Sequence, residues 1–401
     1  MVDLSFHKYD NCYALPIRYF NTEEGLNYHG GGLCCNDIWI KESALFPSSL
    51  ASYQFDTNTV EFIDEDAVFG GCMSPVWGHA LTDCLKHLWW FNTKEYKKTY
   101  KNHKIYYWGP KPLSGVYLEL VRLAGIDITK LRYIDHEMRF RSMIVPDISF
   151  NYTEGWARKE YLDTIDLIAY NAKPYTTKFD KIFLSERESP RTWGIKSLEK
   201  LAISAGYKVY YPGEHSLQEQ ISVLRSANTI LSFESSVGHN TIFCSSQTKL
   251  IMLRKENYKN KYQSIINELR GFDVTTVNAS LSLMNDERFP YAGPFFVYPN
   301  DAVCQAVIPD YQVCSNKYAH LFPWKIFKRY IRYNLYRSEQ TMAHVFAIPE
   351  AKAERLSLEM SKYRCWQFKR IRSFFKLIPL PIGIKEKAIR KIVKYKVRHV
   401  I

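Results

Sequence analysis

Four short apolar runs decide the fold: KIFLS at residues 181–185, KVYY at 208–211, TILSF at 229–233 and KLIML at 249–253. Each has the length of a strand, and helical patterns lie between them near 197–205, 217–226 and 237–244. Runs this apolar that alternate with helices indicate a parallel sheet covered on both faces. Ser216 and Glu219 form a capping box, which predicts that a helix begins just after Ser216.

A second alternating region precedes this one. We expect strands at 68–71, 104–108, 131–135 and 142–146, and helices at 78–91, 116–124 and 156–172. The first 60 residues read as irregular strands and loops. The chain is therefore predicted to be α/β, with an amino-terminal domain at 1–172, a carboxy-terminal domain at 173–316 and a tail at 317–401.

The tail carries most of the charge. The whole chain has a net charge of +13, and residues 317–401 hold 21 basic against 5 acidic side chains. Apolar residues between Ile384 and Val400 form a stripe beside lysines and arginines, which is typical of a basic helix on an anionic membrane surface. A docked helix with a solvated charged side is the alternative. The nearly neutral remainder argues against a nucleic-acid-binding main domain.

The cysteines and the amino terminus bear on location. Nine cysteines without a C-x-x-C pair favour reduced thiols over a disulfide framework or a zinc site. The first residues lack a signal-peptide pattern, and no apolar run is long enough to span a bilayer. We expect a cytoplasmic protein, peripheral at the inner face of the cell membrane.

His79 and Asp83 are the first candidate catalytic residues. They are four residues apart in the predicted helix, so they project from the same face, away from the apolar stripe. Asp83 could hold His79 in one tautomer as a general base, or Asp83 could itself remove a proton. The spacing leaves both assignments open, beside the alternative of a surface pair without function.

The second candidate is the turn ESSVGHN at residues 234–240, directly after a predicted strand. Ser235 and Ser236, with free amides of the first helical turn, suit an anion such as a diphosphate. Glu234 suits a ribose or sugar hydroxyl, and His239 and Asn240 lie one turn into the helix. An ordinary serine-rich helix start is the alternative.

Two arginines make the third candidate. Arg187 and Arg191 follow another predicted strand, at the same edge of the sheet as the turn. Guanidinium groups there could hold phosphate in a bidentate manner, although solvated loop arginines are the alternative. We expect no Walker-type loop, G-x-G-x-x-G fingerprint or D-x-D metal motif, and therefore neither a metal ion nor a cofactor at the site.

Taken together, these motifs resemble the family 61 glycosyltransferases, in the bacterial branch associated with capsular and other surface polysaccharides. The resemblance covers about residues 70–253. It rests on GHALTDCLKHLWW from Gly78, the loop with Arg187 and Arg191, PGE at 212–214 followed by SLQEQ at 216–220, and the turn at 234–240. Two departures are Ser235, where the family usually has glycine, and Lys196, where it often has asparagine.

The resemblance implies two Rossmann-like domains that face a cleft, the GT-B arrangement, with sugar transfer that inverts the anomeric carbon. It implies that a nucleotide-sugar donor binds the carboxy-terminal half and that a polysaccharide or lipid-linked glycan acceptor binds the amino-terminal half. The residues then receive roles as follows: Arg187, Arg191, Ser235 and Ser236 hold the diphosphate; Glu234, His239 and Asn240 contact nucleoside, sugar or phosphate; His79 or Asp83 is the base. The alternative is a non-catalytic protein whose basic, tyrosine-rich tail binds membrane or nucleic acid.

Overall fold

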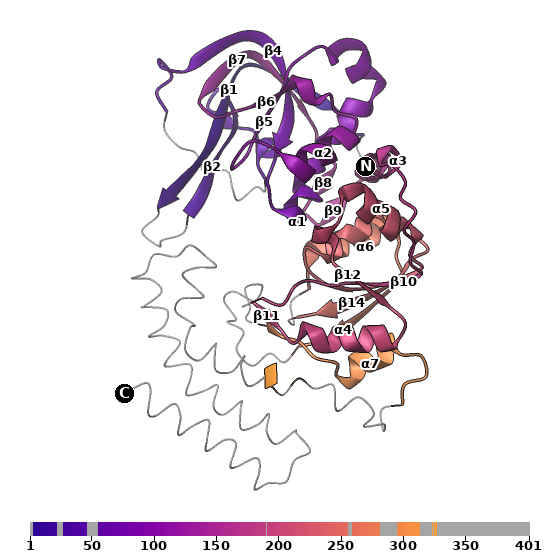
Figure 1. Ribbon diagram of the computed structural model, residues 1–401. Helices are drawn as coiled ribbons and strands as arrows, with labels where there is room; N and C mark the ends of the chain where they lie inside the picture. Colours follow the sequence, from indigo (N-terminus) through magenta and orange to yellow (C-terminus); the bar gives the residue numbers. More distant parts are fainter. Residues whose placement is uncertain are drawn as a thin grey trace, which may run out of the picture.

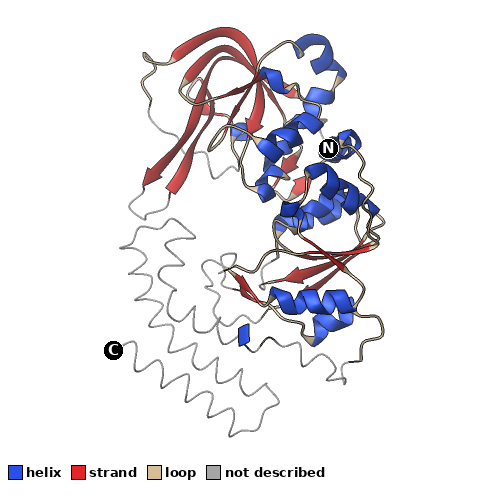
Figure 2. Cartoon of the chain, in the orientation of Figure 1, coloured by secondary structure: helices blue, strands red, loops and turns tan. Residues whose placement is uncertain are grey.

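The described residues form two large sheets with a layer of helices between them and further helices on the far side of the second sheet (Figures 1 and 2). The structure is a computed structural model that describes residues 3–21, 27–45, 55–189, 191–255, 259–280, 295–312, 323, 325 and 326. The predicted basic tail at 317–401 lies outside the described residues, except for positions 323, 325 and 326.

The second sheet confirms the predicted parallel unit. Its five strands run parallel in the order β12-β10-β13-β14-β15. Their bounds are β10 Lys181–Leu184, β12 Lys208–Tyr210, β13 Thr229–Phe233, β14 Lys249–Arg254 and β15 Val274–Asn278. The connecting helices are α4 Ile195–Ser204, η7 Pro212–Glu214, α5 Leu217–Ser226, η8 Gly238–Phe243, α6 Lys261–Arg270 and α7 Asp301–Val307. Two short strands, β11 Thr192–Trp193 and β16 Phe295–Phe296, pair beside it.

Both faces of this sheet are buried, as the apolar runs predict. Phe183 and Leu231 point toward α4 and α7, whereas Ile182 and Ile230 point toward α5 and α6. Ser216 accepts a hydrogen bond from the amide of Glu219 at 3.2 Å, so the predicted helix start is confirmed. The carboxyl ends of β10, β13 and β14 are the edge where open parallel sheets place ligands.

The first sheet is mixed, unlike a Rossmann-type sheet. Its order is β3-β2-β1-β7-β4-β5-β6; β7, β4, β5 and β6 run parallel, and β1, β2 and β3 add antiparallel pairs. The bounds are β1 Phe6–Asn21, β2 Asn27–Cys35, β3 Ile38–Trp39, β4 Glu61–Cys72, β5 Ile105–Trp108, β6 Leu131–Tyr133 and β7 Met138–Pro146. The sequence predicts the strands that correspond to β4 through β7. The structure adds β1, β2 and β3 from residues 6–39 to the same sheet.

Short helices and one hairpin complete the first half. They are η1 Lys41–Ser43, α1 Trp77–Ala80, η3 Asp83–Leu85, η4 Leu88–Asn92, the π-helical turn η5 Tyr96–Tyr100, α2 Gly115–Leu123, η6 Ile128–Lys130, the hairpin β8 Phe150–Asn151 with β9 Trp156–Ala157, and α3 Lys159–Asn171. The predicted helix at 116–124 is confirmed by α2, and the one at 156–172 is shortened because the hairpin uses its first residues.

The predicted helix at 78–91 is wrong as a single element. The α-helix ends at Ala80, and Thr82 has non-helical dihedrals of φ −127° and ψ −82°. The buried Tyr161 hydroxyl lies 2.5 Å from the carbonyl oxygen of Leu81 and 3.2 Å from that of Thr82. A continuing α-helix would need both carbonyls as acceptors. The α-helix thus ends where a tertiary hydrogen bond from Tyr161 reaches the backbone.

The helical layer joins the two halves through one apolar core. Helix α3 contacts α2 of the first half, and it also contacts α5, α6 and η8 of the second half. Tyr161, Ile165 and Ile168 of α3 are fully buried within a cluster that also contains Leu224 of α5 and Ile266 of α6. Because burial of apolar area stabilises in proportion to the area, separation of the halves would expose this layer to water.

The shared core predicts cooperative unfolding. Ile165→Ala is expected to lower the free energy of unfolding by about 2–5 kcal/mol, because it leaves a cavity in the layer between the sheets. Ile203→Ala on α4, where the side chain is 61% exposed, is the matched control and should change it by about 1 kcal/mol or less. Urea titration and calorimetry measure both. Two separate transitions, or equal effects of both variants, would contradict a common core.

Candidate functional site

A cavity of about 800 Å³ lies where the carboxyl ends of β10, β13 and β14 meet the first half of the chain. Seven of the nine predicted site residues line it. They are His79, Arg187, Arg191, Glu234, Ser235, Ser236 and His239. Of the other two, Asp83 lies behind His79 and Asn240 lines a neighbouring cavity. The cavity therefore gathers side chains from both halves.

His79 and Asp83 meet although the helix between them is broken. His79 Nδ1 lies 2.8 Å from Asp83 Oδ2; the histidine side chain is 29% exposed and the carboxylate 3%. The hydroxyls of Thr82 and Tyr262 also bond the carboxylate. Burial, and then the charge of Asp83, raise the pKa of Tyr262, so its hydroxyl remains a donor. The arrangement buries the acid as an orienting group and leaves the imidazole at the cavity.

A glycine lets the two halves approach closely beside this pair. A β-carbon on Gly78 would lie 2.8 Å from Ser236 Oγ and 3.3 Å from His239 Nδ1, so these contacts leave no room for a side chain. The His239 ring packs against Tyr262, and Asn260 lies beside it. Burial lowers the pKa of His239 to about 4, so this ring is neutral near pH 7.

The turn at 234–237 differs from the predicted start of an α-helix. It leads into the short 3-10 helix η8, and its amides are partly used within the turn: Ser235 donates to Phe233, and Gly238 and His239 donate to Ser235. Among the described backbone acceptors, none receives the Ser236 amide. The expected set of free amides is thus reduced. Ser236 lines the cavity, whereas the Ser235 hydroxyl is buried without a hydrogen-bond partner among the described residues.

Glu234 is fixed by protein groups. Its Oε2 lies 2.5 Å from Arg254 Nε, and its Oε1 accepts the amide of Asn260 at 3.0 Å. The carboxylate is only 6% exposed. Glu186 is similarly paired, 2.5 Å from Lys255 Nζ. Both carboxylates that the cavity takes from the ends of β10 and β13 are therefore balanced by basic residues from the end of β14.

Arg187 stands at the border of two cavities. Its guanidinium lies 4.0 Å from the centre of the Tyr211 ring, and its Nε lies 2.8 Å from Glu214 Oε1. Arg191 follows in the same loop, and its carbonyl accepts the amide of Phe295 at 2.7 Å. That bond ties the arginine loop to β16 at the cavity wall.

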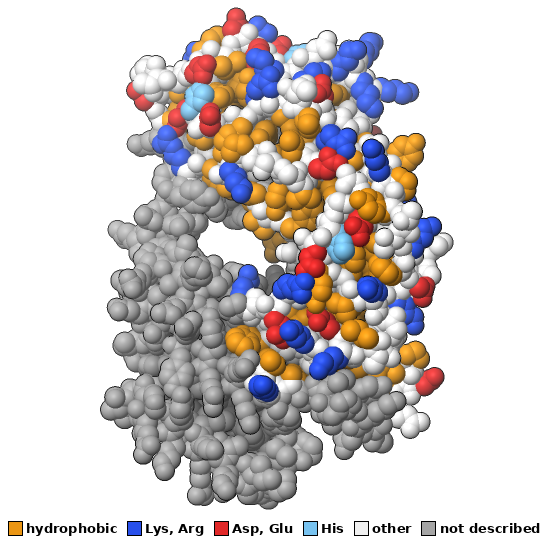
Figure 3. Space-filling view, viewed as in Figure 1, with side chains coloured by type: hydrophobic (Ala, Val, Ile, Leu, Met, Phe, Trp, Pro, Cys, Tyr) orange, Lys and Arg blue, Asp and Glu red, His pale blue; other side chains and the backbone are white. Residues whose placement is uncertain are grey.

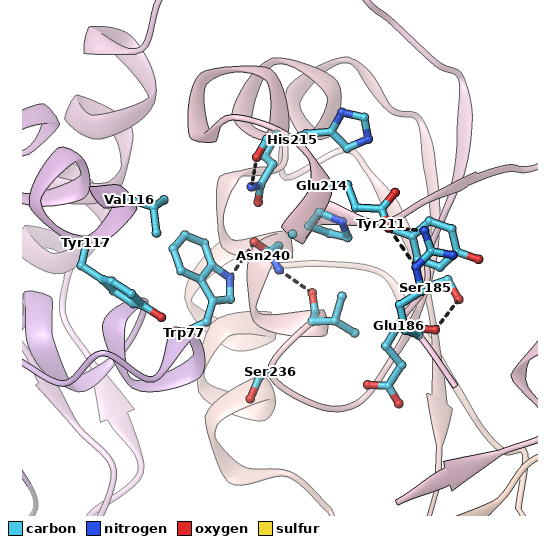
Figure 4. A pocket seen from close by; sticks show the side chains of 15 residues that line it. Trp77, Val116, Tyr117, Ser185, Glu186, Tyr211, Glu214, His215, Ser236 and Asn240 are labelled. Carbon is cyan, nitrogen blue, oxygen red and sulfur yellow. Dashed lines mark hydrogen bonds and ion pairs between the residues drawn. The ribbon is translucent and has the colours of Figure 1, made fainter. Parts of the chain in front are cut away.

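The second cavity, of about 570 Å³, has aromatic walls (Figure 4). Trp77 and Tyr117 reach it from the first half and face Tyr211 from the second. The Trp77 indole N–H donates to Asn240 Oδ1 at 3.0 Å, and Asn240 Nδ2 donates to Val237 O at 2.8 Å. Asn240 therefore links the two halves, and both of these hydrogen bonds are to protein groups. This cavity shares Glu186, Arg187 and Ser236 with the first.

Several residues at the cavities were not predicted from the sequence. They are Trp77, Tyr152, Tyr211, Lys255, Asn260, Lys261 and Tyr262. Lys255 and Asn260 follow β14, so the rule that located Arg187 and Glu234 at strand ends would have found them. Tyr152 lies in the β8–β9 hairpin and stacks on Tyr262 with ring centres 4.2 Å apart. The two tyrosines lie far apart in the sequence, so no local sequence pattern predicts that they stack.

The described residues hold neither a metal-binding cluster nor a membrane-spanning helix near the cavities. In the described ranges, no three His, Cys, Asp or Glu side chains are placed to hold a metal ion, and no helix is long and apolar enough to cross a membrane. The expectation that the chain lacks an Asp-x-Asp motif is wrong, because one occurs at Asp64 and Asp66 in β4. Both carboxylates pair with Arg141, and neither lines the two cavities. On the face in Figure 3, basic and acidic side chains are interspersed.

The comparisons with known proteins agree with this geometry. Residues 77–251 match the model of the family Glycosyltransferase 61. The match begins at the short helix that bears His79 and ends within β14, so it includes all nine predicted site residues. A search of curated proteins finds no significant match. Residues 77–251 are thus a glycosyltransferase family 61 domain, and the enzyme transfers a sugar from a donor to an acceptor.

Proposed function

We propose that this glycosyltransferase transfers a sugar from a nucleotide-sugar donor to a hydroxyl of a capsular or other cell-surface glycan, with inversion. One observation carries the proposal: the His79–Asp83 pair of the first half and Arg187 of the second line one cavity or its wall. Incubation with UDP-, GDP- and CMP-sugars and polysaccharide or lipid-linked acceptors tests it. A ligand that binds only the native state raises its melting temperature, which identifies the donor.

His79 is assigned as the general base. The acceptor oxygen attacks the anomeric carbon, its proton passes to His79 Nε2, and the bond from the anomeric carbon to the diphosphate oxygen breaks. Asp83 holds Nδ1 as the protonated nitrogen and stabilises the imidazolium that forms. This assignment chooses between the two roles that the sequence left open, because the Asp83 carboxylate is buried behind the ring.

The cavity carboxylates favour a single displacement. A retaining enzyme with a covalent intermediate uses a carboxylate that can attack the anomeric carbon. Glu186 and Glu234 are bound to Lys255 and Arg254, and Glu234 also accepts a backbone amide. Attack by an activated acceptor hydroxyl therefore suits this site better, and that attack inverts the configuration.

Basic side chains are assigned to the leaving group. Arg187 and Arg191 would neutralise the diphosphate as the bond breaks, with the Ser236 hydroxyl and the turn at Ser235 beside them. These cations provide the charge that a metal ion supplies in other transferases, so the proposed reaction uses neither metal nor cofactor. Glu234 and His239 then shape the sugar side of the cavity.

The aromatic cavity is assigned to the nucleoside. Flat rings of Trp77, Tyr117 and Tyr211 suit stacking on a base. Because Arg187 and Ser236 border both cavities, a diphosphate there would direct the base to one side and the sugar toward His79 on the other. We assign Asn240 the role of holding the Trp77 indole in place through their hydrogen bond. The diphosphate is then held by the second half, the base lies between rings of both halves, and the acceptor is held by the first half, in a GT-B-like arrangement.

The base is tested by His79→Gln and Asp83→Asn. Each is expected to lower kcat by about 10²- to 10⁴-fold, because proton transfer from the acceptor loses its base or the orientation of that base. Donor binding, measured by calorimetry, should change less than about threefold, since neither group is assigned to the donor. The control is His7→Gln, which removes another His–Asp pair, 3.1 Å apart and at the surface. Unchanged turnover in both site variants would refute the assignment.

The diphosphate site is tested by Arg187→Ala and Arg191→Ala. Loss of one charged hydrogen-bonding group is expected to weaken binding of the donor and of its nucleoside diphosphate by about tenfold or more. Arg132→Ala is the matched control, since that guanidinium bonds the carbonyls of Thr129 and Leu131 outside both cavities. Trp77→Ala should weaken binding of the nucleotide, whereas binding of pyrophosphate should be retained. Donor binding at the wild-type level in both arginine variants would exclude them from the site.

Location remains a sequence-based proposal. Residues 317–401 would attach the enzyme to the inner face of the membrane through their basic side chains. The test replaces five basic residues by glutamine: Lys385, Lys387, Arg390, Lys391 and Lys394. The variant is expected to sediment less with phosphatidylserine vesicles than the wild type does. Sedimentation with neutral vesicles should decrease less. Full retention on anionic vesicles would remove this proposal. Loss of RNA binding alone would favour the nucleic-acid alternative.

A further inference from the structure

Among the described residues, three pairs of a glutamate with an arginine or lysine lie at the two cavities, at the carboxyl edge of the second sheet. They differ in exposure: Arg254–Glu234 has side chains 28% and 6% exposed, Lys255–Glu186 has 11% and 27%, and Arg187–Glu214 has 67% and 48%. An exposed ion pair contributes little to stability because water screens it, whereas separation of a buried pair leaves an uncompensated charge. Arg187–Glu214 is thus the pair that can exchange partners at little cost.

The position of Arg187 does not depend on Glu214 alone. Its guanidinium lies on the Tyr211 ring, and the Tyr211 hydroxyl donates to Glu199 Oε1 at 2.6 Å. The same oxygen accepts the Ser185 hydroxyl at 2.8 Å. Glu199 therefore fixes the ring, and the ring supports the guanidinium whichever anion bonds its edge. Figure 4 shows Glu214 beside Tyr211 at the mouth of the aromatic cavity.

Glu214 occupies the bonding edge of Arg187. Both Nε and Nη2 of the guanidinium contact the single oxygen Oε1 of Glu214. The nearby carboxylate also raises the pKa of Arg187, so the cation persists at every physiological pH. A phosphate oxygen that approached the same edge would meet a donor pair already in use and a carboxylate of like charge.

We propose that Glu214 is a placeholder for the diphosphate: it neutralises Arg187 in the empty enzyme and competes with the donor and the product for that guanidinium. The inference rests on the proposed function, because it takes a diphosphate as the incoming anion. Glu214 is then a positioning residue, and it weakens binding of the product nucleoside diphosphate. The carboxylate recaptures Arg187 when the product leaves, which favours release.

The test is Glu214→Gln in the full chain, because glutamine keeps the shape and the acceptor oxygen but removes the charge. Calorimetry with UDP, GDP, CDP, inorganic pyrophosphate and the phosphate-free nucleosides is the measurement. We expect the Kd of the bound diphosphates and of pyrophosphate to fall by about three- to tenfold, with nucleoside binding unchanged. Asp163→Asn removes a carboxylate from the exposed pair with Lys159 and should change none of these values.

A second background separates competition from simple repulsion. In Arg187→Ala, the added Glu214→Gln substitution should bring no gain, because no guanidinium remains to be shared. Unchanged or weaker diphosphate binding, a gain that persists without Arg187, or weaker nucleoside binding would each overturn the proposal; the last would indicate a ribose contact. If no nucleotide binds the wild-type enzyme, the proposed function fails, and the pyrophosphate result still decides the competition. Failure of both proteins to bind pyrophosphate also overturns it.

Discussion

Burial of one apolar layer against two sheets is the constraint on which the site depends. Helix α3 contributes Tyr161, Ile165 and Ile168 to a core that continues into α5 and α6. Neither sheet can turn far from the other without exposing that layer to water. The fixed contact brings the end of β4, and with it His79, opposite the loops that follow β10 and β13. The cavities occupy the edge that the shared core leaves open.

The parts predicted well are those in which local chemistry and tertiary context agree. Strands β10, β13 and β14 are buried on both faces, so their apolar composition alone identifies them. Their parallel order then places Arg187 and Glu234 at one edge, where the structure has them. The general location of the site thus follows from sequence and topology.

The parts predicted poorly depend on contacts between distant segments. Periodicity at 78–91 is genuinely helical, but Tyr161, some 80 residues away, takes two carbonyls that the helix would need. The antiparallel strands β1 and β2 contain Pro16 and three consecutive glycines, which obscure any strand pattern. Motif residues also differ from expectation in what they bind: Asn240 bonds Trp77, and Glu234 bonds Arg254. Spacing in a sequence does not reveal such partners.

The absence of a side chain at Gly78 has a consequence for how the enzyme can diversify. Gly78 of the first half packs closely against Ser236 and His239 of the second half, where an added β-carbon would lie 2.8 Å from Ser236 Oγ. A larger residue would act as a wedge and move the imidazole of His79 away from the loops of the second sheet. Divergence toward other sugars is therefore expected at the rings and loops that border the two cavities, such as Tyr117, Tyr152 and Tyr211, because a substitution at Gly78 would have to displace Ser236 and His239.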